Sequence, residues 1–243
     1  MICGDDAGYG TAAIPHDAQG VFISRPNRFL SLVNIDGSEE KVHVHDPGRL
    51  TELLYPGNTV LVRRVEKEGR ATSWDVIAAA FEEQWVLVHS GYHRSISEMV
   101  LNDPEISPLG EVVDLKPEIT VGHSRLDFVL TSDGVMTGVE VKGCTLARGG
   151  VALFPDAPTL RGTKHLETLL DMKNQGMRAV LLVLVLRTDV QTFAPNADTD
   201  PLFAEMFWKA VDAGVEVKPL VFRYDGQRVI YLGAIPVSPH RSI

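Results

Sequence analysis

The chain has only two cysteines, Cys3 and Cys144, in 243 residues. Two cysteines cannot build a disulfide framework, and their spacing matches no zinc motif, which excludes a small disulfide-stapled scaffold and a zinc finger. Long apolar runs are also absent, since the longest, Ala179–Leu186, is far shorter than a membrane span. The N-terminus has neither the basic nor the apolar region of a signal peptide. We therefore expect a cytoplasmic protein that does not enter a membrane.

Positive charge is scarce in the chain as a whole. The net charge is -9, so there is no global basic footprint for nucleic acid. The segment Val141–Arg187 is the exception, with seven Lys and Arg against three Asp and Glu. Local positive charge of this kind suits a polyanionic substrate, although an ordinary mixed surface explains it equally well. No P-loop or dinucleotide-binding fingerprint is found.

The first part of the chain has the pattern of a small β-barrel. Residues 1–20 are rich in Gly, Ala and Asp and predict a loose tail. Over residues 21–90, short strand-like runs alternate with turn signals. The candidate strands are Val21–Ser24, Phe29–Ile35, Lys41–His45, Thr59–Val65, Ser73–Ala80 and Trp85–His89. Such a series predicts a barrel of the oligonucleotide-binding (OB) type, and an SH3-like barrel is the alternative.

Residues 91–243 mix helical and strand patterns. Helical spacing of apolar residues appears over Ser95–Asn102, Thr159–Asn174 and Asp200–Asp212. Strands are predicted at Ala179–Leu186, Val215–Tyr224 and Arg228–Leu232. The whole chain is therefore predicted to be α+β, with an OB-like barrel followed by an α/β domain whose helices cover a mixed sheet.

A predicted hairpin carries the most informative residues. Two strand-like runs, Ser124–Thr131 and Val135–Lys142, flank the turn signal Asp133-Gly134. A two-residue loop places Asp127 directly across from Glu140, with Cβ atoms roughly 4.5–5.5 Å apart. Lys142 lies on the same face as Glu140 because side chains alternate along a strand.

Two like charges facing each other destabilise a sheet unless something offsets their repulsion. One carboxyl group can take up a proton, or a divalent cation can bind between the two. A metal next to a lysine is a suitable arrangement for phosphodiester hydrolysis. The alternative is a solvated hairpin on which Asp127, Lys142 and Arg125 make weak surface pairs.

The string SRLDFVL…VEVKGCTL…FPDAPTLRGTKHLETL resembles the sugar fermentation stimulation protein A family. The resemblance runs from Phe22 to Pro236, and its most selective element is Phe154–Ala157 followed by Thr159, Arg161-Gly162 and Lys164–Leu166. It implies an OB-like domain and a domain similar to PD-(D/E)XK nucleases, in DNA-binding proteins linked to regulation of sugar (maltose) metabolism. The chain departs from the family in His45–Leu50, which is shorter, and in Gly143-Cys144.

The same resemblance assigns roles to individual residues. It implies that Asp127 and Glu140 bind Mg²⁺ or Mn²⁺ and that Lys142 holds the phosphate or activates water. Glu118 is a further candidate ligand, since related nucleases place another acid on the first helix. The candidate contacts to nucleic acid are Arg49, Arg125, Arg161 and Lys164. His165 completes the catalytic set, with capping or packing as its alternative role, and the helix N-terminus beside it is suited to phosphate.

Other residues are weaker candidates. His43 and His45 share a strand face, but the sequence shows no third metal ligand near them. Trp74 and Trp85 can stack on bases in an OB domain, and core packing is the favoured alternative. Cys144 has no adjacent histidine to activate it, so a nucleophilic role is not expected.

Three functions remain open from the sequence. The first is a Mg²⁺-dependent nuclease that binds DNA, or another nucleic acid. The second is a catalytically silent DNA-binding regulator, and the third is a small-molecule binding or interaction protein that uses the acidic surface. A homo-oligomer is compatible with all three.

Overall fold

The structure is a computed structural model that describes residues 10–66, 68–121 and 124–238. Residues 1–9 of the expected tail, with Cys3, lie outside the described residues. Within the described part of the chain, no helix has the length and apolar character needed to span a bilayer.

The N-terminal part is a closed five-stranded barrel. Its strands are β2 (Ala18–Asn27), β3 (Leu30–Ile35), β4 (Ser38–His43), β5 (Thr59–Arg64) and β6 (Trp74–Phe81). They pair in the order β4-β3-β2-β5-β6, and a parallel pairing of β4 with β6 closes the barrel. The interior is mostly aliphatic, and Trp74 and Trp85 pack against it, as favoured from the sequence. The predicted OB-like barrel is confirmed.

The expectation of a loose tail is wrong for residues 11–20. Thr11–Ala13 form strand β1, which pairs with β16 (Arg228–Ala234) near the other end of the chain. Ile14 is buried, and its backbone N donates to Gln227 O at 2.8 Å. The sequence pattern missed this strand because its partner lies more than two hundred residues away.

The C-terminal part is built on a mixed sheet in the order β16-β15-β13-β10-β9-β8. The further strands are β8 (Val112–Val121), β9 (Ser124–Ser132), β10 (Val135–Cys144), β13 (Arg178–Val185) and β15 (Glu216–Tyr224). β10, β13 and β15 are parallel to one another, and β9 runs antiparallel to β10. β7 (Gln84–Leu87) joins this sheet to the barrel through Trp85 opposite Tyr224. β8 was not predicted from the sequence.

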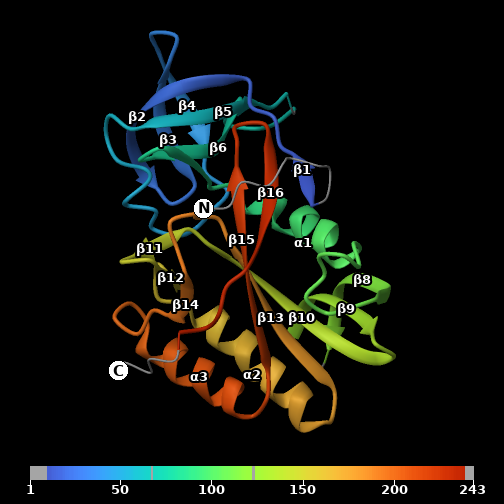
Figure 1. Cartoon of the computed structure of the whole chain (residues 1–243). Coiled ribbons are helices and arrows are strands. Elements are labelled where there is room, and N and C mark those ends of the chain that lie inside the picture. Colours follow the sequence, from blue (N-terminus) through green and yellow to red (C-terminus); the bar gives the residue numbers. More distant parts are fainter. Residues whose placement is uncertain (1–9, 67, 122–123, 239–243) are drawn as a thin grey trace.

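Three α-helices cover the sheet. α2 (Leu160–Asn174) and α3 (Pro201–Asp212) lie side by side on one face of the sheet (Figure 1). Most buried residues of these two helices belong to one hydrophobic cluster. Most of those of α1 (His93–Leu101) belong to a second cluster, which also fills the barrel. Thr159 Oγ1 caps α2 by accepting from Gly162 N at 3.0 Å. Asp200 caps α3 and also accepts from Thr159 N at 2.8 Å. One carboxylate thus fixes where both helices begin.

A small second sheet lies beside the helices, made of β11 (Leu146–Arg148), β12 (Val151–Phe154) and β14 (Thr192–Pro195). Gly149 and Gly150 form the turn between β11 and β12 with positive φ, as their sequence indicates. The α+β class and the three predicted helices are confirmed, with each helix start within two residues of the prediction.

Candidate metal centre

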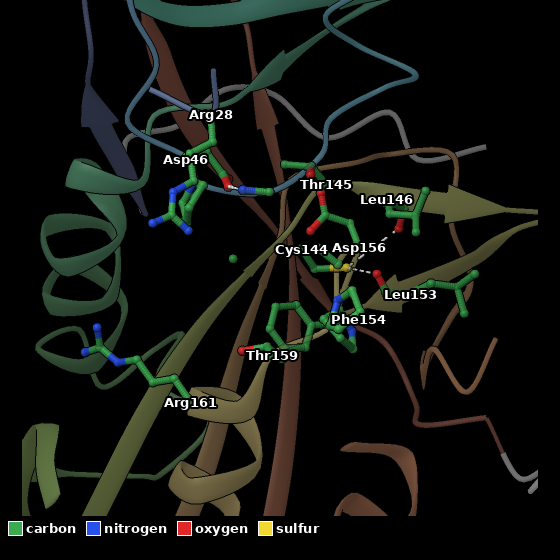
Figure 2. Close-up of a pocket in the computed structure, with 16 residues that line it drawn as sticks. Arg28, Asp46, Cys144, Thr145, Leu146, Leu153, Phe154, Asp156, Thr159 and Arg161 are labelled. Carbon is green, nitrogen blue, oxygen red and sulfur yellow. Dashed lines mark hydrogen bonds between the residues drawn. The ribbon is translucent and has the colours of Figure 1, made fainter. Parts of the chain in front are cut away.

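A cleft of about 380 Å³ lies between the barrel and the C-terminal domain (Figure 2). Arg28 and Asp46 line it from the barrel, and Asp156, Thr159 and Arg161 line it from the start of α2. Gly143, directly after Lys142, is also in its wall. The cleft therefore adjoins the residues that the hairpin was predicted to bring together.

Two interactions hold the barrel loop at this cleft. The Arg25 guanidinium donates to four backbone carbonyls, including those of Asp46 at 2.8 Å and Gly48 at 2.7 Å. Asp156 Oδ2 accepts from Leu50 N at 3.2 Å. Asp156 belongs to the FPDA element, so this motif fastens the C-terminal domain to the barrel.

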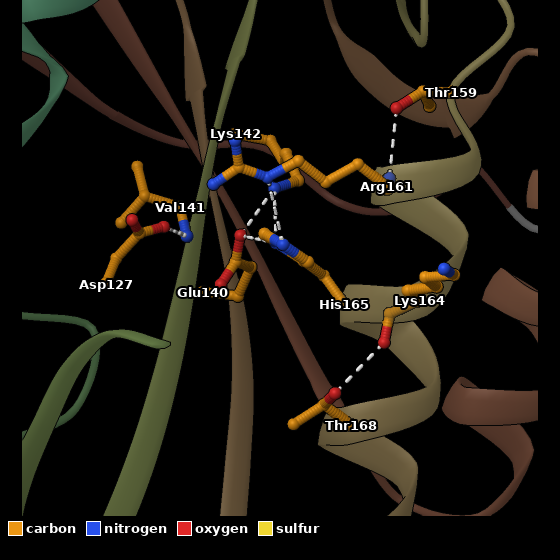
Figure 3. A network of polar contacts seen from close by, with 10 residues as sticks. Asp127, Glu140, Val141, Lys142, Thr159, Arg161, Lys164, His165 and Thr168 are labelled. Carbon is orange, nitrogen blue, oxygen red and sulfur yellow. Dashed lines mark hydrogen bonds and ion pairs between the residues drawn. The ribbon is translucent and has the colours of Figure 1, made fainter. Parts of the chain in front are cut away.

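The hairpin has the predicted register. Val135 pairs with Ser132, and the pairs continue to Val139 opposite Phe128. Beyond that point Asp127 uses its Oδ2 atom to accept from Val141 N at 2.7 Å. The carboxylate thus takes the place of a backbone carbonyl where β9 leaves β10. This differs from the direct pairing expected, and Figure 3 shows Asp127 and Glu140 to either side of the β10 ribbon.

Glu140 is the buried carboxylate of the centre, with 1 % exposure. Its Oε1 atom accepts from Lys142 Nζ at 2.5 Å and also contacts His165 Nδ1. His165 comes from α2, which carries it over the β10 face (Figure 3). The structure thus brings together Glu140, Lys142 and His165, all three of which were predicted from the sequence.

Arg161 orients the His165 ring. Its Nε atom donates to His165 Nε2 at 3.2 Å, four residues along α2. A ring nitrogen that accepts a hydrogen bond carries no proton, so the proton of the neutral ring is on Nδ1. Nδ1 faces Glu140, to which it donates, and Lys142 Nζ lies 3.1 Å from the same nitrogen. Arg161 and His165 therefore fix the position of the Glu140 carboxylate.

The second oxygen of Glu140 is left without a partner. Oε2 is buried and has no hydrogen bond from any of the described residues. A buried carboxylate oxygen without a donor is costly, and a bound ion is one of the few arrangements that explain it. The donor set is made of carboxylate oxygens, which suits a hard cation such as Mg²⁺. The free oxygen of Glu140 therefore fits the expected metal, whereas Asp127 lies on the other side of the β10 ribbon and already accepts from Val141 N.

The two acids have pKa values shifted in opposite directions. Burial raises the pKa of Asp127, and the neighbouring charge of Glu140 raises it further. Burial also opposes ionisation of Glu140, but the hydrogen bond from His165 and the charge of Lys142 outweigh it, so the pKa of Glu140 is lowered. The centre thus pairs an acid held ionised with one that takes up a proton more readily.

Glu118 lies on strand β8, whereas the resemblance suggested an acid on a helix. It shares a cleft of about 200 Å³ with Asp127 and His93. Glu118 is exposed, has a φ of 55°, and lies 3.6 Å from the Arg125 guanidinium. The positive φ costs of order 1 kcal/mol in a non-glycine residue. Glu118 is thus on the Asp127 side of the centre.

Gly143 explains one departure from the family pattern. A methyl group at this position would overlap the ring of His93, which packs directly on the β10 backbone beside Lys142. Cys144, the next residue, is buried, with its Sγ atom 3.3 Å from Leu153 O, and burial raises its pKa. These positions agree with a packing role for both residues, and with the absence of a nucleophilic role for Cys144.

The predicted cationic contacts are spread over a wider area. Arg161 and Lys164 are exposed on α2, and Arg125 is exposed on β9. Arg49 is exposed on the barrel loop but does not line the larger cleft, where Arg28 lies instead. Sequence reasoning missed Arg28, Asp46 and Asp156. Only the FPDA string pointed to one of them.

Comparison with known proteins gives the family. Residues 23–88 match the SfsA N-terminal OB domain, and residues 91–228 match the sugar fermentation stimulation protein RE domain. The chain belongs to the sugar fermentation stimulation protein family. The resemblance drawn from the motifs is thereby confirmed.

Relatives in this family are similar over nearly their whole length. A sugar fermentation stimulation protein homolog of Methanococcoides burtonii is 46% identical over 230 residues, which cover 92% of this chain and 93% of that protein. The homolog of Thermotoga neapolitana is 42% identical over 224 residues, covering 92% and 96%. The solved structure of Pyrococcus furiosus SfsA in complex with Ca²⁺ aligns with a TM-score of 0.84 at 28% identity, covering 91% of this chain and 95% of that one.

Proposed function

We propose that this protein binds DNA and hydrolyses its phosphodiester bonds with Mg²⁺ or Mn²⁺ held by Asp127 and Glu140. The observation that carries the proposal is the buried Oε2 atom of Glu140, which has no donor among the described residues while Lys142 and His165 hold Oε1. The complex of the Pyrococcus furiosus relative with Ca²⁺ supports a site for a hard divalent cation in this family.

The residues of the centre have distinct roles in this proposal. Asp127 and Glu140 would hold the cation, and Glu118, which lines the smaller cleft with Asp127, would be a further ligand. When bound, the cation polarises a phosphoryl oxygen and lowers the pKa of a bound water. Lys142 Nζ holds the scissile phosphate or the attacking water. His165 and Arg161 keep Glu140 in place and ionised.

DNA would approach across the interdomain cleft. Arg28 on the barrel and Arg161 at the start of α2 face this cleft from opposite domains. The N-terminus of α2 adds its positive dipole there. Lys164, Arg125 and Arg49 extend the cationic area, and binding should weaken as salt rises because counterions are released. A cytoplasmic location and a link to sugar metabolism are part of this proposal.

Cleavage of labelled DNA duplexes and single strands tests the proposal. We expect products with Mg²⁺ or Mn²⁺, none with EDTA, and at least a hundredfold lower rate in Asp127→Asn and Glu140→Gln. Glu205→Gln, an exposed acid on α3, is the matched control and should cleave at the wild-type rate. Equal cleavage by wild type and Asp127→Asn would overturn the assignment of the site.

A catalytically silent DNA-binding regulator is the second candidate. It is favoured by the close contact of Lys142 and His165 with Glu140, which neutralises this acid without a metal. Gel-shift titrations at several salt concentrations separate the two candidates. Salt-sensitive binding without cleavage would leave the silent regulator, and retention of neither duplex nor single strand at low salt would overturn both.

A further inference from the structure

A second set of metal-ligating side chains lies where the barrel meets the start of α1, and it shares no residue with the carboxylate centre. His45 follows β4, Asp75 is the second residue of β6, and His89 follows β7. Among residues 10–66, 68–121 and 124–238, this is the only set of at least three such side chains whose ligand atoms lie within 4.8 Å of one another. The parallel pairing of β4 with β6, which places His43 opposite Asp75, brings His45 to the carboxylate.

The distances fit ligands that share one ion. His45 Nε2 lies 3.1 Å and His89 Nε2 lies 3.7 Å from the same Asp75 Oδ2 atom. Ligands about 2.0–2.1 Å from a tetrahedral zinc are separated from each other by about 3.3 Å, which lies between these two values. His45 Nε2 is buried yet makes no aligned hydrogen bond to any described residue, including Asp75. Proximity without alignment is expected when two ligands point at a common third atom.

The surrounding residues prepare the set for a cation. The two imidazole rings stack with centroids 3.8 Å apart, and both Nε2 atoms face Asp75 Oδ2. The His89 side chain is buried, with 8% of its residue surface exposed. Arg70 pairs with both oxygens of Asp75, with its Nη1 atom 3.3 Å from Oδ2 and its Nη2 atom in contact with Oδ1, while the two histidines face Oδ2. A second group that orients a ligating carboxylate is usual around bound metals.

We propose that His45, Asp75 and His89 bind a divalent transition metal of the zinc class, at a site separate from Asp127 and Glu140. Two imidazoles and one carboxylate favour Zn²⁺, Co²⁺ or Ni²⁺ over Mg²⁺ and Ca²⁺, which seek oxygen ligands. The fourth position is open to water. Because His89 directly precedes the turn into α1, and Ser90 Oγ donates to His45 O at 2.8 Å, the ion would clip the barrel to the start of the C-terminal domain.

Titration of tag-free, metal-free protein with Co²⁺, followed by its visible absorption, tests this site. The titration uses Glu140→Gln as background, so that the carboxylate centre does not contribute. We expect one equivalent of bound Co²⁺. In His45→Gln and His89→Gln, the affinity for Co²⁺ should fall by at least about 100-fold, because losing even a residue that only orients a ligand costs about 10–100-fold. His43→Gln is the matched control, because His43 lies next to the set without belonging to it.

Unchanged Co²⁺ affinity in both His45→Gln and His89→Gln would overturn the proposal, as would no stoichiometric binding by the wild type. If either variant fails to fold, the wild type still decides. Zn²⁺ should raise its melting temperature and perturb the histidine NMR signals, while equimolar Mg²⁺ should do neither. Identical melting temperatures with Zn²⁺ and Mg²⁺ would contradict the site. This outcome is independent of DNA cleavage, which tests the carboxylate centre.

Discussion

Each domain buries one carboxylate among cationic and imidazole side chains, Glu140 in the C-terminal sheet and Asp75 in the barrel. Glu140 has Lys142 and His165 on one oxygen and no described partner on the other. Asp75 has Arg70 across both of its oxygens, with two histidines facing Oδ2. The first arrangement leaves an oxygen for a hard cation, while the second adds nitrogen donors that a softer metal prefers.

The comparison extends to the charge state of buried acids. For both Glu140 and Asp75, burial disfavours the ionised form, but the nearby cations and imidazoles outweigh it, so both pKa values are lowered. Asp127 and Asp46 are partly buried and have fewer cationic partners, and burial raises their pKa values. The number of donors around a buried carboxylate, more than its depth, decides whether it stays ionised.

Removing the lysine from Glu140 should give the largest effect. Lys142→Met leaves a buried carboxylate with His165 as its remaining partner, and we expect a loss of about 3 kcal/mol in the free energy of unfolding. Urea unfolding at pH 7 measures it. Lys164→Met, at an exposed position on α2, is the control and should stay within about 0.5 kcal/mol of wild type. A loss below about 1 kcal/mol in Lys142→Met would show that Glu140 is not held as an ion pair.

Removing the cation beside Asp75 in the barrel should reduce the free energy of unfolding by less. Arg70→Met removes one partner of Asp75 but leaves His45 and His89 beside it, so we expect a loss of about 2 kcal/mol, the usual value for a hydrogen bond to a charged group. The same urea experiment applies, with exposed Lys41→Met on β4 as control. A loss equal to that of Lys142→Met would remove the distinction between the two carboxylates.

Asp46 has few donors around it, so its ionised carboxylate should destabilise the fold. Burial raises the pKa of Asp46 to about 6, although a hydrogen bond from Gly48 N partly offsets this and nearby Asp156 adds to it. The folded state therefore binds a proton more tightly than the unfolded state, so wild-type stability falls as pH rises from about 4 to about 6. Asp46→Asn should be more stable than wild type by about 1–2 kcal/mol at pH 8 and equal to it below pH 4.

Thermal unfolding across this pH range checks the Asp46 prediction. Asp36→Asn, in an exposed turn whose positive φ asparagine tolerates, is the control for the same change of side chain at a surface site. If Asp46→Asn is less stable than wild type at pH 8, a cation in solution compensates the ionised carboxylate. The number of protein donors would then not decide whether such a carboxylate stays ionised.

The smallest effect is expected for an acid that is well paired but partly exposed. Arg178 holds Glu216 with bonds of 2.7 and 3.1 Å, which lowers the pKa of Glu216 to about 2. Its contribution is present above the unfolded pKa of about 4.5 and is lost as pH falls toward 2. Glu216→Gln should lose about 0.5–1 kcal/mol at pH 7, because solvent screens the pair. The difference in free energy of unfolding between wild type and Glu216→Gln should shrink as the pH falls from 4.5 to 3. A difference that stays constant would contradict a contribution from ionised Glu216.

Local signals in the sequence determined much of this protein. The turn at Asp133-Gly134 and the alternation of the flanking strands set the register that brings Glu140 and Lys142 to one face, and the cap at Thr159 set the helix that carries His165. These are short-range effects of backbone preference and side-chain period, so they can be read from neighbouring residues.

Only the tertiary structure decided which distant residues meet. β1 pairs with a strand more than two hundred residues away, Asp127 bonds to Val141 N where the strands part, and Glu140 Oε2 is left without a described donor. The sequence offered His45 without a third ligand, and closure of the barrel supplied Asp75 and His89. Such contacts depend on long-range strand pairing, which local propensity does not encode because the partners are separated by the rest of the fold.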